Sequence, residues 1–171
     1  MMSRLVWLLL LALLPGCSLY RSLFPGPEKC KEIPLELFVK AGEVLNLSPE
    51  GQSLPVEVRA YLLKSTDKFD ELDFNTLWRS GPEALGPTLI KTVTFTVFPA
   101  EEKIETVVGS PELAFVAIVG IFRQYDGNQW KKVVDVRPAV DACTPESLHT
   151  QIRAQLADNR VIAEPLKPAA E

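Results

Sequence analysis

The chain has 171 residues, of which 23% are charged, and a formal net charge of −4 at pH 7. This acidic balance argues against nucleic-acid binding, which needs a basic face, and against electrostatic attachment to anionic lipid. The length is that of one domain with a buried core.

Residues 1–16 are predicted to be a lipoprotein signal peptide. Arg4 provides a positive start, and ten unbroken apolar residues, Leu5 to Leu14, follow it. The run is too short for a membrane span, which needs roughly 20 apolar residues. Leu14-Pro15-Gly16-Cys17 then has the pattern of a bacterial lipobox, with cleavage before Cys17. We expect Cys17 to carry a diacylglycerol and an acyl chain; an ordinary signal peptide followed by a chance cysteine is the alternative.

Residues 17–29 are expected to be the acylated cysteine and a flexible tether. They contain Pro25-Gly26-Pro27 and no periodic apolar pattern. The twelve residues after Cys17 would reach roughly 40 Å if fully extended. Cleavage removes one basic residue and no acidic one, so the mature chain would have a net charge near −5. Membrane attachment would therefore come from the acyl chains, since each buried methylene contributes about 0.8 kcal/mol.

Cys30 and Cys143 remain once Cys17 is acylated. They are then the only possible intramolecular pair, and an exported protein meets an oxidising compartment. We expect a disulfide between them, because the cysteines have no redox or metal-binding spacing; two buried reduced thiols are the alternative.

The domain is expected to span residues 30–164, followed by a frayed tail at 165–171. Apolar residues that alternate with period two, separated by turn signals, predict seven or eight short strands. Leu113–Phe122 is apolar on both faces, which predicts a central strand covered on both sides. A helix over residues 145–156 is the alternative for the last part. The expected strands are Ile33–Lys40, Leu54–Lys64, Thr92–Phe98, Lys103–Val108, Leu113–Phe122, Trp130–Arg137, Ile152–Leu156 and Val161–Ile162.

One helical insertion is expected around residues 67–80, ended by Gly81-Pro82 and covering the central strand. Asp73 interrupts its apolar positions, so two short helical turns, with Asp73 capping the second, are an alternative. Many strands and little helix predict an all-β, two-sheet β-sandwich.

A catalytic or metal site has little support in the sequence. The one histidine, His149, would need Ser147 or an acid beside it to serve a hydrolase. The acidic residues at 67–73 lack the spacing of a calcium loop and are better explained as a solvated helix face. We therefore expect no enzyme activity, no metal and no cofactor other than the lipid on Cys17.

Residues 41–53 are predicted to be a long loop, and thirteen residues are many for a connection between adjacent strands. The loop contains three apolar residues that belong to no predicted strand, Val44, Leu45 and Leu47. They either bind a partner or pack back over the open end of the sandwich.

The order of these motifs resembles the TssJ family, the outer-membrane lipoproteins of type VI secretion systems. A lipobox and a first strand are followed by a loop with Asn46 and Gly51, then by Ser-Leu-Pro-Val-Glu-Val-Arg-Ala-Tyr-Leu-Leu at 53–63. The likeness continues through Asp73-Phe74, Phe98-Pro99, Phe122-Arg123 and Trp130-Lys131, and covers roughly residues 1–137.

The resemblance implies a transthyretin-like sandwich anchored in the outer membrane and facing the periplasm. Ser18 after the lipidated cysteine suits export to that membrane. The implied role is a scaffold or adaptor within a TssJ–TssL–TssM complex, binding the periplasmic C-terminal domain of TssM. The family uses the loop after its first strand for this contact, which here implicates Val44, Leu45, Asn46, Leu47 and Gly51. A sandwich that binds lipid or glycan is the alternative; it would expose an apolar cavity or an aromatic platform, for which Trp78 and Trp130 are the candidates.

Overall fold

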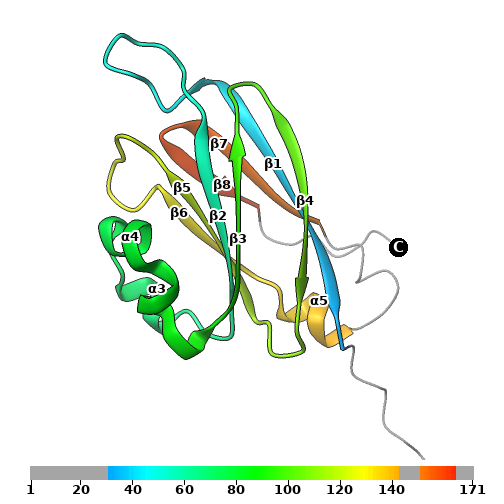
Figure 1. Ribbon diagram of the computed structural model, residues 1–171. Helices are drawn as coiled ribbons and strands as arrows, with labels where there is room; N and C mark the ends of the chain where they lie inside the picture. Colours follow the sequence, from blue (N-terminus) through cyan, green and yellow to red (C-terminus); the bar gives the residue numbers. More distant parts are fainter. Residues whose placement is uncertain (1–30, 143–150, 165–171) are drawn as a thin grey trace, which may run out of the picture.

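The computed structural model describes residues 31–142 and 151–164, and these form a β-sandwich (Figure 1). Two four-stranded sheets have the orders β4-β1-β7-β8 and β3-β2-β5-β6. The all-β, two-sheet prediction is confirmed. Cys17, Cys30, Cys143 and His149 lie outside the described residues, so the lipidation and the disulfide stay predictions. The strands are β1 Ile33–Leu45, β2 Val56–Leu63, β3 Leu89–Val97, β4 Glu102–Gly109, β5 Phe115–Ile121, β6 Lys131–Asp135, β7 Gln151–Asp158 and β8 Arg160–Ala163.

Strand β1 lies inside its sheet, antiparallel to β4 and parallel to β7. Its alternation turns Leu35, Leu37 and Val39 into the core, where each is fully buried. Pro34 is its second residue, a place where the missing N–H is tolerated.

The prediction that β1 ends at Lys40 is wrong, because the strand continues to Leu45. A register shift between Ala41 and Leu45 in the pairing with β7 accommodates Gly42, which sequence reasoning had placed in a loop. A glycine inside a strand often marks such an irregularity. The loop after the first strand therefore begins only at Asn46.

The structure also decides between strand and helix for residues 151–158. Residues 151–158 form β7 rather than a helix, and β8 pairs with it as an antiparallel hairpin. The predicted strand at 130–137 is too long, because β6 stops at Asp135 and α5, Arg137–Ala142, follows. Asp135 Oδ1 accepts the backbone N–H of Arg137 at 3.0 Å, which turns the chain at this point.

The helical insertion consists of two helices, α3 (Asp67–Glu71) and α4 (Phe74–Leu85). Asp73 caps the second one by accepting the backbone N–H of Thr76 at 2.7 Å, as the two-turn alternative predicted. Both helices cover the β3-β2-β5-β6 sheet (Figure 1), and the interior of β5 is buried on both faces. Helix α4 does not end at Gly81-Pro82 but bends at Ser80, continues to Leu85 and leads into a short 3-10 turn, η2 (Gly86–Thr88).

Lys131 of β6 holds α3 against the sheet. Its ammonium donates to the carbonyls of Phe69 and Leu72 at 3.2 and 3.1 Å, where the helix ends. Burial lowers the pKa of Lys131, while Asp70 and Asp73 act in the opposite direction. None of the helices in the described ranges is long and apolar enough to cross a bilayer.

Candidate functional site

Four connections meet at one end of the sandwich, which we call the loop end. They are the β1–β2 loop (46–55), the β3–β4 turn (98–101), the β5–β6 loop (122–130) and the β7–β8 turn at residue 159. They meet there because β1, β3, β5 and β7 all finish at that end (Figure 1). The predicted partner-binding residues all lie in or beside the first of these connections.

Asn46 joins three of the four connections. Its Nδ2 donates to the carbonyl of Pro55 at 2.8 Å, and its Oδ1 accepts the backbone N–H of Arg123 at 2.8 Å. Its own N–H donates to the carbonyl of Asp158 at 3.1 Å. The residue is 5% exposed and has a φ of 48°, a conformation that asparagine adopts more readily than most residues. The side-chain amide thus ties the β1–β2 loop to the β5–β6 loop, and the backbone N–H of the same residue bonds to the last residue of β7.

The neck of the β1–β2 loop is closed by a second set of bonds. Leu54 N donates to Leu45 O at 2.9 Å, and the Ser53 hydroxyl donates to Glu43 O at 2.8 Å. The same hydroxyl accepts the N–H of Leu45 at 3.3 Å. The loop therefore leaves the sheet in a defined direction.

The tip of the loop is organised around Ser48. Its hydroxyl accepts the backbone N–H groups of Glu50 and Gln52, each at 3.2 Å. Gly51 follows with a φ of 80°, which glycine adopts without strain. A hydrogen bond between the Ser48 side chain and the Glu50 carboxyl lowers the pKa of that carboxyl.

The five predicted contact residues divide into two groups. Val44 and Leu47 are 49% and 40% exposed, and Gly51 is exposed at the tip. Leu45 is fully buried in the core, and Asn46 is buried beneath the loop. The first group forms surface, whereas the second supports it; a charge at Leu45 would therefore perturb the core.

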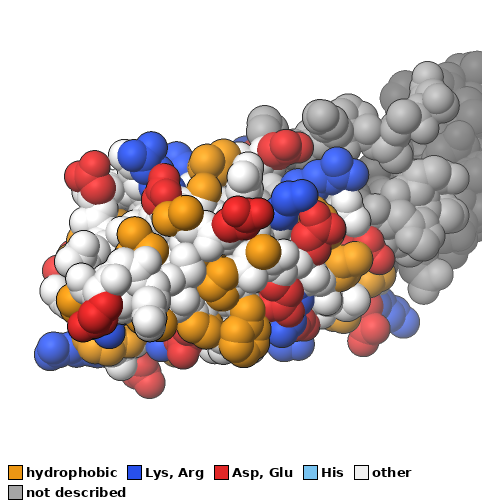
Figure 2. All heavy atoms as spheres, turned by 90° about the horizontal axis from the view of Figure 1, so that it is seen from above, with side chains coloured by type: hydrophobic (Ala, Val, Ile, Leu, Met, Phe, Trp, Pro, Cys, Tyr) orange, Lys and Arg blue, Asp and Glu red, His pale blue; other side chains and the backbone are white. Residues whose placement is uncertain are grey.

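Phe98 of the β3–β4 turn is a surface residue that sequence reasoning missed, because it was assigned to a strand. It is 57% exposed. Its turn is fixed to β1 by bonds from Ala100 N to Gly42 O at 3.0 Å and from Ala41 N to Glu101 O at 2.8 Å. The alternation of the strand could have revealed this exposure. Phe95 and Val97 point inward, so Phe98, the next residue, falls on the outward face. Figure 2, which looks onto this end, shows apolar side chains scattered among charged ones.

A shallow hollow of about 250 Å³ opens between the β5–β6 loop and the β7–β8 turn. Its lining contains no serine, cysteine or histidine, so it offers no nucleophile paired with a base. Across residues 31–142 and 151–164, no three His, Cys, Asp or Glu side chains are grouped to hold a metal ion. The hollow is lined by Gln124, Tyr125, Asp126, Asp158, Asn159 and Arg160.

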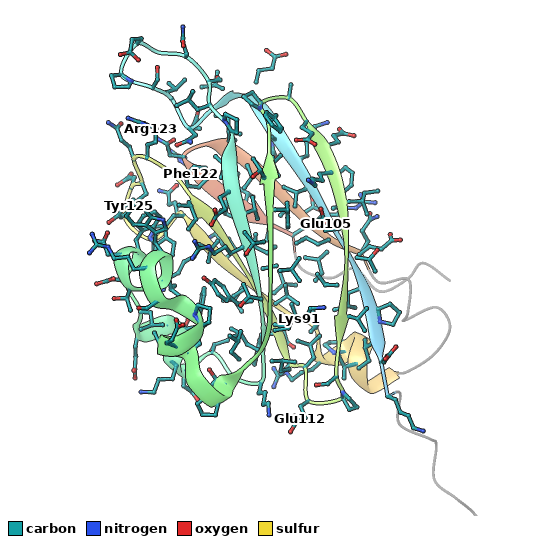
Figure 3. All side chains as sticks on the ribbon, in the orientation of Figure 1. Lys91, Glu105, Glu112, Phe122, Arg123 and Tyr125 are labelled. Carbon is teal, nitrogen blue, oxygen red and sulfur yellow. The ribbon has the colours of Figure 1, made fainter. Side chains whose placement is uncertain are left out.

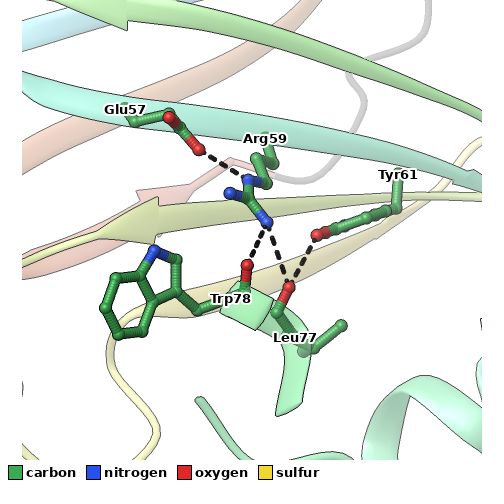
Figure 4. Close-up of polar contacts among 5 residues, drawn as sticks. All are labelled: Glu57, Arg59, Tyr61, Leu77 and Trp78. Atoms are coloured by element: carbon green, nitrogen blue, oxygen red, sulfur yellow. Dashed lines mark hydrogen bonds and ion pairs between the residues drawn. The ribbon is translucent and has the colours of Figure 1, made fainter. Parts of the chain in front are cut away.

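Beside the loop end, Arg59 of β2 holds the bend in α4 (Figure 4). Pro82 has no N–H, so the carbonyl of Trp78 one turn earlier lacks its helical partner. Arg59 Nη1 donates to that carbonyl at 2.8 Å and to the carbonyl of Leu77 at 3.1 Å. Its Nε donates to the Glu57 carboxylate at 2.6 Å. A strand side chain therefore replaces a bond that the helix cannot make.

Tyr61 completes this contact. Its hydroxyl donates to Leu77 O at 3.2 Å, and burial raises the pKa of this hydroxyl. Gly81 is required here, since a Cβ on it would lie 2.5 Å from the Tyr61 hydroxyl oxygen. Helix α4 is thus held at its bend by side chains from β2.

Replacing Arg59 with methionine should lower the free energy of unfolding by about 2 kcal/mol, because it leaves the Trp78 carbonyl without a donor. Urea denaturation measures this. Lys40→Met is the matched control, since it removes an exposed pair with Glu102 and should cost under about 1 kcal/mol. Equal losses in the two variants would contradict the role given to Arg59.

Comparison with solved structures places the fold among type VI secretion proteins. The T6SS lipoprotein TssJ1 from Pseudomonas aeruginosa is 22% identical with a TM-score of 0.67, covering 81% of this chain and 98% of that one. Serratia marcescens Lip, a membrane-bound component of the Type VI Secretion System, is 16% identical with a TM-score of 0.67, covering 77% and 97%. A chain of the structure described as T6SS protein TssM C-terminal domain (869-1107) from EAEC is 24% identical with a TM-score of 0.64, covering 78% and 98%.

A chain of a structure described as a Type VI membrane complex is 25% identical with a TM-score of 0.66, covering 78% and 98%. No curated protein matches the sequence. The profile of the T6SS-SciN family, described as type VI secretion lipoprotein, VasD, EvfM, TssJ, VC_A0113, matches residues 34–159. This family comprises lipoprotein components of the secretion system and not enzymes. Since the match covers most of the chain, the protein belongs to the type VI secretion lipoprotein family.

Proposed function

We propose that this chain is an outer-membrane-anchored adaptor that binds the periplasmic C-terminal domain of TssM through its loop end, within a TssJ–TssL–TssM complex. The observation that carries the proposal is the β1–β2 loop, which is held by hydrogen bonds and exposes Leu47, beside the exposed Val44 at the end of β1. The similarity to chains from structures named for TssM and for a type VI membrane complex supports the choice of partner.

The loop end suits protein binding on physical grounds. Its apolar side chains at Val44, Leu47 and Phe98 are exposed, so their burial by a partner would contribute hydrophobic free energy. The bonds made by Asn46 and Ser48 hold the loop in one conformation. Little conformational entropy would then be lost on binding.

The anchor suits the same arrangement. Cys17 would hold the lipid, and residues 18–29 would form the tether of roughly 40 Å. The domain begins with β1, whose first residue, Ile33, lies at the end of the sandwich opposite the loop end (Figure 1). The tether would therefore enter from the membrane side and leave the loops directed into the periplasm.

The alternative role in lipid or glycan binding predicts an apolar cavity or an exposed aromatic platform, for which Trp78 and Trp130 are the candidates. Trp78 is 46% exposed, but Trp130 is 1% exposed and packs inside the domain. The two rings therefore do not form a platform together, and the adaptor role is the one we retain.

Leu47→Asp should weaken binding to the TssM periplasmic domain at least tenfold, because it places a charge in an apolar contact. Its side chain is 40% exposed, so the unfolding midpoint should barely change. Isothermal calorimetry measures the affinity. Ile162→Asp is the control, since Ile162 on β8 is 48% exposed and lies outside the loop end. Unchanged affinity for Leu47→Asp would refute the loop contact.

A further inference from the structure

We infer that the same partner also covers a second surface, the aromatic face, formed by Trp78 and Arg79 of α4 and Tyr125 of the β5–β6 loop. This inference rests on the proposed function and extends the contact from the loop end onto the helical insertion. The part of the partner that covers this face would be apolar, to match two exposed rings.

Four aromatic rings form one continuous cluster, with two of them exposed on this face and two buried behind it. Tyr125 stacks on Phe74 with ring centroids 4.2 Å apart and planes at 22°. Phe74 also meets the edge of Trp130 at 5.1 Å and packs near Trp78 at 6.5 Å. Phe74 and Trp130 are buried, whereas Tyr125 and Trp78 are 43% and 46% exposed. The buried rings thus support the exposed ones from behind.

The aromatic face is also held rigidly. Arg59 bonds to the backbone carbonyl of Trp78, so the helix that presents this ring is fixed to β2. The guanidinium of Arg79 lies 5.8 Å from the centre of the Trp78 ring. Tryptophan, tyrosine and arginine are the residues most enriched at the energetic centres of protein interfaces. A rigid pair of exposed rings beside an arginine has that composition.

The aromatic face continues directly from the loop end. Phe122 is buried and anchors the β5–β6 loop, and the next residue, Arg123, donates its N–H to Asn46. Two residues later Tyr125 reaches α4. Figure 3 shows this path, with Arg123 beneath the β1–β2 loop and Tyr125 beside the helix. One short segment therefore joins the two surfaces.

Interface size also calls for a surface beyond the loop. A stable protein interface buries about 800 Å² on each partner and involves roughly 20–30 residues. The β1–β2 loop spans only residues 46–55. Among the surfaces that adjoin it, the aromatic face has the composition of an interface, and the β5–β6 loop makes it continuous with the proposed contact.

Trp78→Ala tests the inference, since it removes the ring and keeps the backbone carbonyl that Arg59 binds. We expect affinity for the TssM periplasmic domain to fall about tenfold, with an unchanged unfolding midpoint, and Trp78→Phe to restore most of it. Ile104→Ala on β4, a site 57% exposed on the other sheet, should have no effect. Hydrogen exchange of the wild-type complex should show protection of residues 74–79 and 123–126.

The outcomes separate the two proposals. If Leu47→Asp weakens binding but Trp78→Ala does not, the aromatic face is not part of the contact and the inference fails, while the proposed function stands. If Trp78→Ala abolishes self-association without changing the affinity for TssM, the face binds a second copy and the inference also fails. If the wild-type domain does not bind TssM, the proposed function itself is wrong.

Discussion

Asn46→Ala is expected to lower the free energy of unfolding by about 3 kcal/mol, mostly through two lost hydrogen bonds. The substitution leaves the N–H of Arg123 and the carbonyl of Pro55 without their partner. It also places alanine at a φ of 48°, which costs about 1 kcal/mol. Because the β1–β2 and β5–β6 loops would loosen together, affinity for TssM should fall as well. Urea denaturation followed by circular dichroism measures the stability.

Asn46→Gly separates the loss of the side-chain hydrogen bonds from the backbone strain at this position. Glycine adopts the same backbone conformation without strain but makes no side-chain hydrogen bond. We expect it to be about 1 kcal/mol more stable than Asn46→Ala and still less stable than the wild type. If both variants were as stable as the wild type, the amide of Asn46 would not organise the loop end.

Cys17→Ser is expected to remove the protein from the outer-membrane fraction, because it removes the thiol that would carry the lipid. The net charge of −4 offers no electrostatic attachment to replace the acyl chains. The described domain begins at residue 31, so it should remain folded. Fractionation of cell envelopes, with circular dichroism of the released protein, measures both results.

Cys30→Ser is the matched control for Cys17→Ser. It also removes a thiol near the start of the chain but leaves the lipobox intact. This variant should remain with the outer membrane. If Cys17→Ser also remained there, the lipid anchor would be refuted.

Much of the fold could be predicted from local patterns. Alternation along residues 92–98 identified β3, because a strand with one buried face repeats every two residues. Asp73 signalled the start of α4, because a cap bonds to the backbone only three residues away. The lipobox and the motif order indicated the family in the same way. These signals all depend on residues that are close together in the chain.

The boundaries that failed depend on distant residues. Gly42 has the local signature of a loop, but Ala41 and Leu45, on either side of it, pair with β7 and keep it within β1. Pro82 has the local signature of a helix end, but α4 continues past it. Arg59 of strand β2 donates to the carbonyl of Trp78, which the missing N–H of Pro82 leaves without its helical partner. In both cases a tertiary contact outweighed a local preference.

The candidate site also has features that local sequence predicts and features that depend on contacts between distant residues. The sequence alone predicts a loop over residues 41–53 that contains apolar residues, and the resemblance to the TssJ family implies that this loop contacts a partner. Only the tertiary structure decided which of those residues are surface. Leu45 is in the core, and Asn46 binds Arg123, which lies 77 positions away. Trp130 is buried where Phe74, far from it in sequence, packs against its ring, whereas Trp78 is 46% exposed. Periodicity specifies a face of a strand, but which element covers that face is set by the folded chain.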